Sequence, residues 1–195
     1  MDPSSESVVL SLGTFAEMLS DPEGYNPERL KSLSSLVPIP LSSFIEAILY
    51  SDEDVMRERL SDLEDYAAEA NSIQAWFNLG RLAHRLFFHQ AAIGYYSNAA
   101  DLAEIRRDDS LPEILLSLGS LHGEEEDWDR ACQCYERALK AMDEAQRPVL
   151  LPRVLDRLGR ARRQQGDYHR ARICYSRILE ALEPGDSEGR MQATA

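Results

Sequence analysis

The sequence predicts an all-α fold: an α-solenoid of about three stacked helical hairpins, preceded by further helices toward the N-terminus. One pattern occurs three times, at intervals of 39 and then 40 residues counted from glycine to glycine. Each copy has a Leu-Gly pair, an alanine twelve residues after the glycine, a tyrosine four residues later, and a small or apolar residue three beyond that. A fixed period of this length is typical of stacked repeats, which bury their apolar sides against their neighbours. The repeated positions are Leu79, Gly80, Ala92, Tyr96 and Ala99; Leu118, Gly119, Ala131, Tyr135 and Ala138; and Leu158, Gly159, Ala171, Tyr175 and Ile178.

The charge of the chain is negative and unevenly distributed. The formal net charge is −13, and residues 1–70 carry 15 acidic against 4 basic side chains, whereas residues 149–195 carry 6 against 9. Such a chain is a poor ligand for the phosphates of nucleic acids and for anionic membrane surfaces. The uncharged run of residues 32–45 is too short to span a bilayer. Neither nucleic-acid binding nor membrane insertion is therefore expected.

The three cysteines, Cys132, Cys134 and Cys174, match no metal-ligand spacing and are expected to be buried thiols. The beginning of the sequence has Asp2 and Glu6 but no basic stretch before its first apolar run, so no signal peptide is expected. The expected compartment is the cytoplasm, with the nucleus left open.

The first 71 residues are expected to form helices that do not follow the repeat. Residues 1–40 predict helices and then a proline-rich joint, because each proline disfavours helix in the residue before it. Residues 41–71 predict a helical pair whose second helix is capped by Asp52 and runs to Ala70. The pair lacks the Leu-Gly signature, so it is either a degenerate repeat or a cap of the stack. Residues 184–195 predict a disordered tail.

Three repeats are predicted within residues 72–183, at about 72–106, 110–146 and 150–183. Pro112 and Pro152 each precede the repeated glycine by seven residues, and proline fits the first turn of a helix, so both are expected to mark helix starts. The glycines fall inside the first helix of each hairpin, where glycine costs about 1 kcal/mol relative to alanine. We expect close packing against the second helix as the reason. The repeated alanines should serve the same packing, and the tyrosines should fill the interface with the next hairpin.

These repeated residues resemble tetratricopeptide repeats. The resemblance covers about residues 73–183, and its most specific part is Gly166-Asp167-Tyr168 followed by Ala171 and Tyr175. The period near 40 residues and the helix-starting prolines are similar to the lengthened repeats of kinesin light chains and LGN-type polarity adaptors. The resemblance implies a right-handed superhelix whose concave face, lined by the first helices, binds an extended peptide or a partner helix.

Basic side chains recur at the helical phase that this resemblance turns toward the groove. Residues three, four and seven apart lie on one side of a helix, and an arginine can hold a carboxylate through two hydrogen bonds. We therefore predict an adaptor or scaffold that binds an acidic linear peptide or a partner helix. The second hairpin offers only a mixed set that includes Ser117 and Ser120. The predicted groove residues are Asn78, Arg81 and Arg85 in the first hairpin, and Arg153, Arg157, Arg160 and Arg163 in the third, with Arg162 beside them.

Two alternatives concern other contacts. The last hairpin is expected to expose Ile173, Leu179 or Leu182, because the residues after it do not form the polar helix that commonly closes a stack. One alternative is therefore a structural subunit of a larger complex, or a homo-oligomer, that uses this hairpin and the N-terminal helices. A more distant alternative is a co-chaperone of a heat-shock protein with a non-standard carboxylate clamp. Arg153 and Arg157 match the bases that such a clamp has on its third repeat, whereas the first two repeats do not match.

No motif in the sequence points to an enzyme. The chain has no phosphate-binding glycine loop, no Gly-x-Ser-x-Gly and no His-Glu-x-x-His. Its four histidines are scattered over different predicted helices and turns, and no cluster has metal-ligand spacing. The sequence therefore predicts no catalysis, no cofactor and no metal site.

Overall fold

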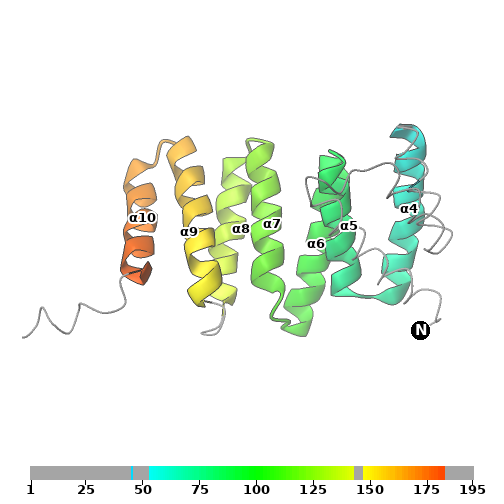
Figure 1. Ribbon diagram of the computed structural model, residues 1–195, viewed down its shortest axis with the longest axis horizontal. Coiled ribbons are helices and arrows are strands. Elements are labelled where there is room, and N and C mark those ends of the chain that lie inside the picture. Colours follow the sequence, from blue (N-terminus) through cyan, green and yellow to red (C-terminus); the bar gives the residue numbers. More distant parts are fainter. Residues whose placement is uncertain (1–44, 46–52, 143–146, 183–195) are drawn as a thin grey trace, which may run out of the picture. The chain divides into compact units, whose positions relative to one another are not determined.

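The computed structural model describes residues 45, 53–142 and 147–182, and the elements within these residues are helices, labelled α4 to α10 in Figure 1. The predicted all-α class of helical hairpins is confirmed. The predictions for residues 1–40, for most of the first helix of the 41–71 pair and for the 184–195 tail lie outside the described residues. None of the described helices is long and apolar enough to cross a membrane.

The chain divides after Arg106 into two compact units. The first unit contains α4 (Glu53–Ala70), α5 (Ile73–Arg85) and α6 (His89–Arg106). Helices α5 and α6 form an antiparallel hairpin, and α4 packs against α5 (Figure 1). Leucines and alanines dominate the buried side chains of this unit, which allows the helix backbones to approach closely.

The second unit contains two hairpins. Helix α7 (Leu111–Glu124) pairs with α8 (Trp128–Ala141), and α9 (Arg147–Gln164) pairs with α10 (Tyr168–Leu182). Helix α9 also packs against α8 and, over a smaller area, against α7, so the two hairpins are stacked (Figure 1). Because each helix leaves its apolar stripe facing a neighbour, α7, α8 and α9 share a continuous core.

The two prolines that were expected at helix starts occupy different positions. Pro112 lies in the first turn of α7, as predicted. Helix α9 begins earlier, at Arg147, so Pro152 lies inside it, and the expectation that Pro152 marks the start is wrong. A proline lacks the amide hydrogen that would bond to the carbonyl four residues earlier. Here that carbonyl belongs to residue 148, in the first turn of α9, so the interruption is confined to the start of the helix.

In each hairpin the repeated glycine lies under the ring of the repeated tyrosine. A Cβ atom on Gly119 would lie 2.6 Å from Cε1 of Tyr135, and one on Gly159 would lie 2.8 Å from Cε1 of Tyr175. Side chains in packed interiors do not approach so closely, and the first hairpin has the same arrangement. The predicted close packing is confirmed, and the repeated alanines are buried as expected. The tyrosine of the same hairpin, however, is what requires the glycine, a contact that the repeat pattern alone does not reveal.

Each hairpin turns through one residue with a left-handed backbone. Phe87, Glu126 and Gly166 occupy equivalent positions and have φ values of 62°, 60° and 80°. In the second and third hairpins an aspartate follows, and Asp127 and Asp167 accept hydrogen bonds from the backbone amides three residues later, at 3.1 and 3.0 Å. These bonds cap α8 and α10 at their N-termini. The first hairpin has no aspartate at this position.

Candidate functional site

Helix α9 carries a row of basic side chains that we call the arginine face: Arg153, Arg157, Arg160 and Arg163. All four side chains are exposed. Their spacings of four, three and three residues keep them on one side of the helix, while apolar residues between them, such as Val154 and Leu158, are buried. The structure therefore brings together the four predicted site residues of the third hairpin.

Arg160 has a partner within the arginine face. Its Nε lies 3.0 Å from a carboxylate oxygen of Asp156, one turn earlier on the same helix. Exposed pairs of this kind contribute only about 0.3–0.5 kcal/mol. A carboxylate from another molecule that makes two hydrogen bonds to the guanidinium can therefore replace Asp156 at little cost.

Arg157 lies near a tyrosine hydroxyl at the junction of α7, α8 and α9. Tyr135 of α8 is 3% exposed, and its hydroxyl is hydrogen-bonded to Ser120 of α7. Burial raises the pKa of Tyr135, whereas the bond to Ser120 and the positive charge of Arg157 act in the opposite direction. The Ser120 hydroxyl donates a hydrogen bond of 2.9 Å to the backbone oxygen of Leu116, so the guanidinium of Arg157 is the group of this cluster that suits a carboxylate. From the sequence, Ser120 belongs to the mixed set of polar residues of the second hairpin, and Tyr135 is expected only to fill the interface with the next hairpin.

The predicted site residues of the first hairpin lie on α5, in the first unit. Asn78 is 2% exposed, and its Oδ1 accepts a hydrogen bond of 2.9 Å from Nε2 of Gln74. Arg81 is half-buried and Arg85 is exposed. Of these three predicted residues, Arg85 is thus the most accessible to another molecule.

Arg162 adjoins the arginine face in the sequence but points toward α8. It is ion-paired with Glu136 of α8 and donates a hydrogen bond of 3.1 Å to Oε1 of Gln165. Gln165 in turn donates a hydrogen bond of 2.6 Å to Asp129 at the start of α8. These polar contacts join the two hairpins of the second unit. The helical phase alone shows that Arg162 falls outside the arginine face. It does not predict that the partner of Arg162 is Glu136, an acid 26 residues earlier in the sequence.

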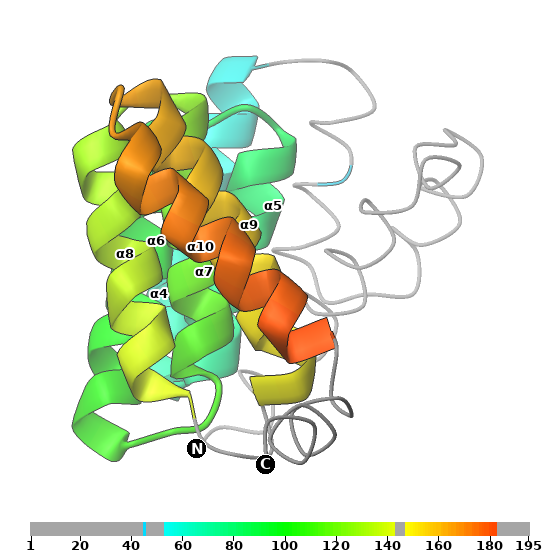
Figure 2. The same cartoon turned by 90° about the vertical axis from the view of Figure 1, so that its left-hand side faces the viewer.

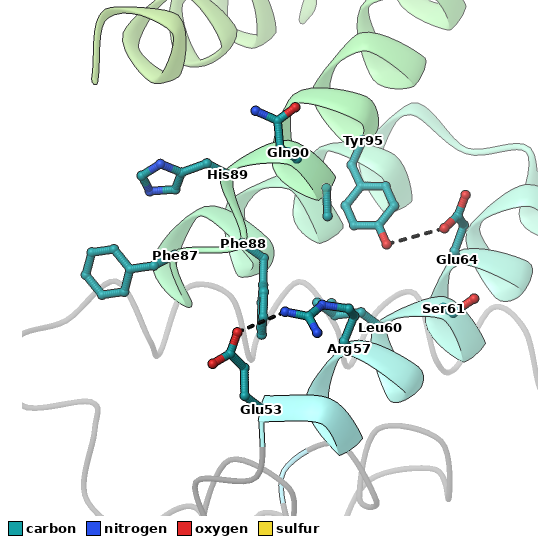
Figure 3. A pocket seen from close by; sticks show the side chains of 11 residues that line it. Glu53, Arg57, Leu60, Ser61, Glu64, Phe87, Phe88, His89, Gln90 and Tyr95 are labelled. Carbon is teal, nitrogen blue, oxygen red and sulfur yellow. Dashed lines mark hydrogen bonds and ion pairs between the residues drawn. The ribbon is translucent and has the colours of Figure 1, made fainter. Parts of the chain in front are cut away.

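The first unit contains a pocket of about 500 Å³ between α4 and the turn that joins α5 to α6 (Figure 3). The guanidinium carbon of Arg57 lies 5.5 Å from the centre of the Phe88 ring, a cation–π distance. Arg57 also pairs with Glu53 at 2.9 Å. The Tyr95 hydroxyl donates a hydrogen bond of 3.3 Å to Glu64. These charged groups on the rim bind one another, so the pocket offers mainly apolar surface.

This pocket was not predicted from the sequence. In the first hairpin, Phe87-Phe88-His89 replaces the polar turn of the other hairpins. This apolar turn was the sequence feature from which a pocket could have been predicted. Burial, together with the neighbouring Glu64 carboxylate, raises the pKa of Tyr95 far above its ordinary value, so this hydroxyl remains a hydrogen-bond donor. The pocket is therefore a place for an apolar group.

The cysteines are free and buried, as predicted. Burial raises the pKa of all three thiols, and that of Cys134 rises to about 11. A neutral thiol is a poor nucleophile and a poor metal ligand. In the part of the chain that the structure describes, no group of three His, Cys, Asp or Glu side chains is arranged to hold a metal ion.

Residues 110–183, which include α7 to α10, match the family model of the tetratricopeptide repeat. The solved structure of BtubC (BKLC) from P. vanneervenii is similar, with a TM-score of 0.58 and 20% identity over 93% of this chain and 92% of that one. A structure of MamA gives a TM-score of 0.55 and 19% identity over 94% and 96%. No curated protein matches the sequence.

These likenesses concern the fold and, for residues 110–183, the kind of repeat. Proteins with tetratricopeptide repeats are in general non-catalytic scaffolds for protein–protein interaction. The finer likeness to kinesin light chains and LGN-type adaptors stays a prediction.

Proposed function

We propose that the protein is a non-catalytic interaction scaffold that binds an acidic linear segment of a partner protein along α9. The observation that carries this proposal is the exposure of four arginines on one side of that helix. An arginine fork binds a carboxylate through two parallel hydrogen bonds, which gives orientation as well as attraction.

The spacing of the arginines suits a peptide in an extended conformation. Residues four apart on a helix are separated by about 6 Å along its axis. Alternate residues of an extended strand are about 6.6 Å apart and point to the same side. Two acidic residues separated by one other residue therefore match Arg153 and Arg157, and the arginine face continues past them to Arg160 and Arg163.

A pair of synthetic peptides tests the proposal. One has glutamate at alternate positions, and its control has glutamine there. Fluorescence anisotropy should show binding of the glutamate peptide that weakens as salt is added, because exposed charges are screened. In the double variant Arg157→Glu, Arg160→Glu, binding should weaken by about tenfold or more.

The control is Arg177→Glu, which reverses one arginine charge at an exposed site on α10. This variant should bind the glutamate peptide nearly as well as the unchanged protein. Circular dichroism should show the same helix content and melting temperature for all variants. Equal binding of the two peptides, or undiminished binding by the double variant, would refute the proposal.

A second candidate function rests on a different surface. Tyr168, Ile173 and Leu179 of α10 are large apolar or aromatic side chains with exposed fractions of 70%, 46% and 62%. Exposed groups of this kind often mark interfaces, so the alternative is a structural subunit joined through α10. Light scattering over a range of concentrations tests the homo-oligomeric form of this idea, and a strict monomer argues against it.

A further inference from the structure

Helix α8 shows how the fold covers the second helix of a hairpin, and α10 is its counterpart 40 residues later. On α8, Cys132 and Tyr135 are 2% and 3% exposed, and Leu139 is half-buried. Helix α9 packs against this helix, and the Cys132 thiol lies 3.5 Å from Oε1 of Gln165, just after α9. A helix from the next hairpin thus covers this side of α8.

The same positions on α10 are accessible. We call them the α10 face: His169, Arg172, Tyr175, Ser176 and Leu179. Arg172 is exposed where α8 has a buried cysteine, and Leu179 is 62% exposed where α8 has a half-buried leucine. Figure 2 looks toward α10 from the side opposite α9. The α10 face therefore presents an apolar residue and a base at positions that the fold elsewhere covers with a helix.

The charges on this face are changed relative to α8. On α8, Asp129 accepts a hydrogen bond from Gln165, and Glu136 forms an ion pair with Arg162. Both of these partners belong to the following hairpin. The counterparts of the two acids on α10 are His169 and Ser176, so neither acid is repeated. A helix resembling α9 would bring an arginine toward Arg172 without an acid to pair with it, which is unfavourable. The α10 face thus fits a helix of the opposite charge.

We propose that the α10 face binds an amphipathic helix of a partner protein, with aspartates or glutamates beside its apolar stripe. The apolar stripe covers Leu179 and Tyr175, and an acidic side chain pairs with Arg172. This surface is separate from the arginine face, so the inference goes beyond the proposed function and does not depend on it.

A second copy of the chain is a poor occupant as far as the described helices show. Its α9 and α10 present arginines, which would repel Arg172. Its α4 has the required acidic residues, but the apolar side of α4, including Leu60 and Leu63, is already buried in the first unit. The charge of the face therefore favours a different protein.

The test uses the full chain and two synthetic helical peptides. Each has about 18 residues, long enough to hold a helix when bound, and both share one leucine stripe. One peptide has glutamates beside the stripe and the other has lysines. Anisotropy should show that the glutamate peptide binds about tenfold more tightly than the lysine peptide. Arg172→Glu should reverse this preference. Leu179→Ser should weaken the binding of both peptides.

Two control variants distinguish binding at the α10 face from a general effect of charge and from binding at the arginine face. Arg177→Glu has the same charge change on α10 but lies outside the α10 face, so the preference should persist. Arg157→Glu disturbs the arginine face but retains Arg172, so this variant should still bind the glutamate helix more tightly than the lysine helix. If Arg172→Glu keeps the original preference, or if Arg157→Glu abolishes binding of the helix, the inference is overturned. Self-association that Leu179→Ser abolishes would overturn it as well, because a second copy would then occupy the face.

Discussion

Replacing glycine by alanine at two positions of the first hairpin should change stability in opposite directions. Gly80 of α5 lies under the ring of Tyr96, and a Cβ atom there would lie 2.6 Å from Cε1 of the ring and closer still to Cδ1. Gly94 lies in α6, where a Cβ atom would meet no atom within 4 Å. Both residues are helical and belong to one hairpin, so they differ mainly in the room for a methyl group.

The magnitude follows from two effects. Alanine is favoured over glycine in a helix by about 1 kcal/mol, and this gain applies at both positions. At Gly80 the methyl group must displace Tyr96, which is 2% exposed and whose ring lies 5.7 Å from that of Phe77 and 6.3 Å from that of His84. Overpacking of this kind costs about 1–3 kcal/mol. We expect Gly94→Ala to gain about 1 kcal/mol and Gly80→Ala to lose up to about 2 kcal/mol.

Urea unfolding followed by circular dichroism measures both changes, and the difference between the two variants removes the helix-propensity term they share. In thermal melts each 1 kcal/mol should correspond to about 2–4 °C for a chain of this size. A Gly80→Ala variant as stable as Gly94→Ala would show that Tyr96 moves aside at no cost. The tyrosine would then not explain why glycine occurs at this position.

Three further predictions concern the turns and the thiols. Gly166 has φ of 80° and free space around it, so Gly166→Ala should lose about 1 kcal/mol in urea unfolding through backbone strain alone; no loss would contradict the left-handed turn. Asp127→Ala removes the side chain that caps α8 and should cost about 1 kcal/mol, whereas Asp127→Asn should retain most of the stability. Burial raises the pKa of Cys134 from 9.0 to about 11, so the folded state disfavours the thiolate. The stabilising contribution of the protonated thiol is present below pH 9.0 and is lost as the pH rises toward 11. Between these pH values, the free energy of unfolding measured in urea should therefore decline less for Cys134→Ala than for the unchanged protein.

Much of the fold could be predicted because it depends on local spacing. The intervals between Gly80, Gly119 and Gly159 give the register of the hairpins, and the helical phase of the α9 arginines gives their common side. The start of α9 was not predictable from Pro152, because the helix already begins at Arg147 and the proline interrupts only a bond of its first turn. The inward turn of Arg162 was likewise hidden, since its partner Glu136 belongs to another helix.

The pocket of the first unit was missed for a related reason. Phe87-Phe88-His89 stood out only as a departure from the polar turn of the other hairpins. Its meaning depends on α4, which brings Arg57 to the ring of Phe88 and Glu64 to the hydroxyl of Tyr95. These contacts join residues about 30 positions apart in different helices, and no short-range pattern encodes them.

Equivalent positions in the stacked hairpins separate what the fold requires from what it leaves open. The glycines recur because a Cβ atom would collide with a tyrosine ring. Arg157 and Arg160 lie close to Gly159 in α9, yet both are exposed and neither is needed to fill the core. Serines occupy the equivalent positions around Gly119, so the backbone does not demand arginine there. The chain has a net charge of −13, yet four exposed arginines share one side of α9, where the pair between Arg160 and Asp156 is weak enough to be exchanged. Packing does not account for this row of bases, and the proposed binding of an acidic partner would give it a role.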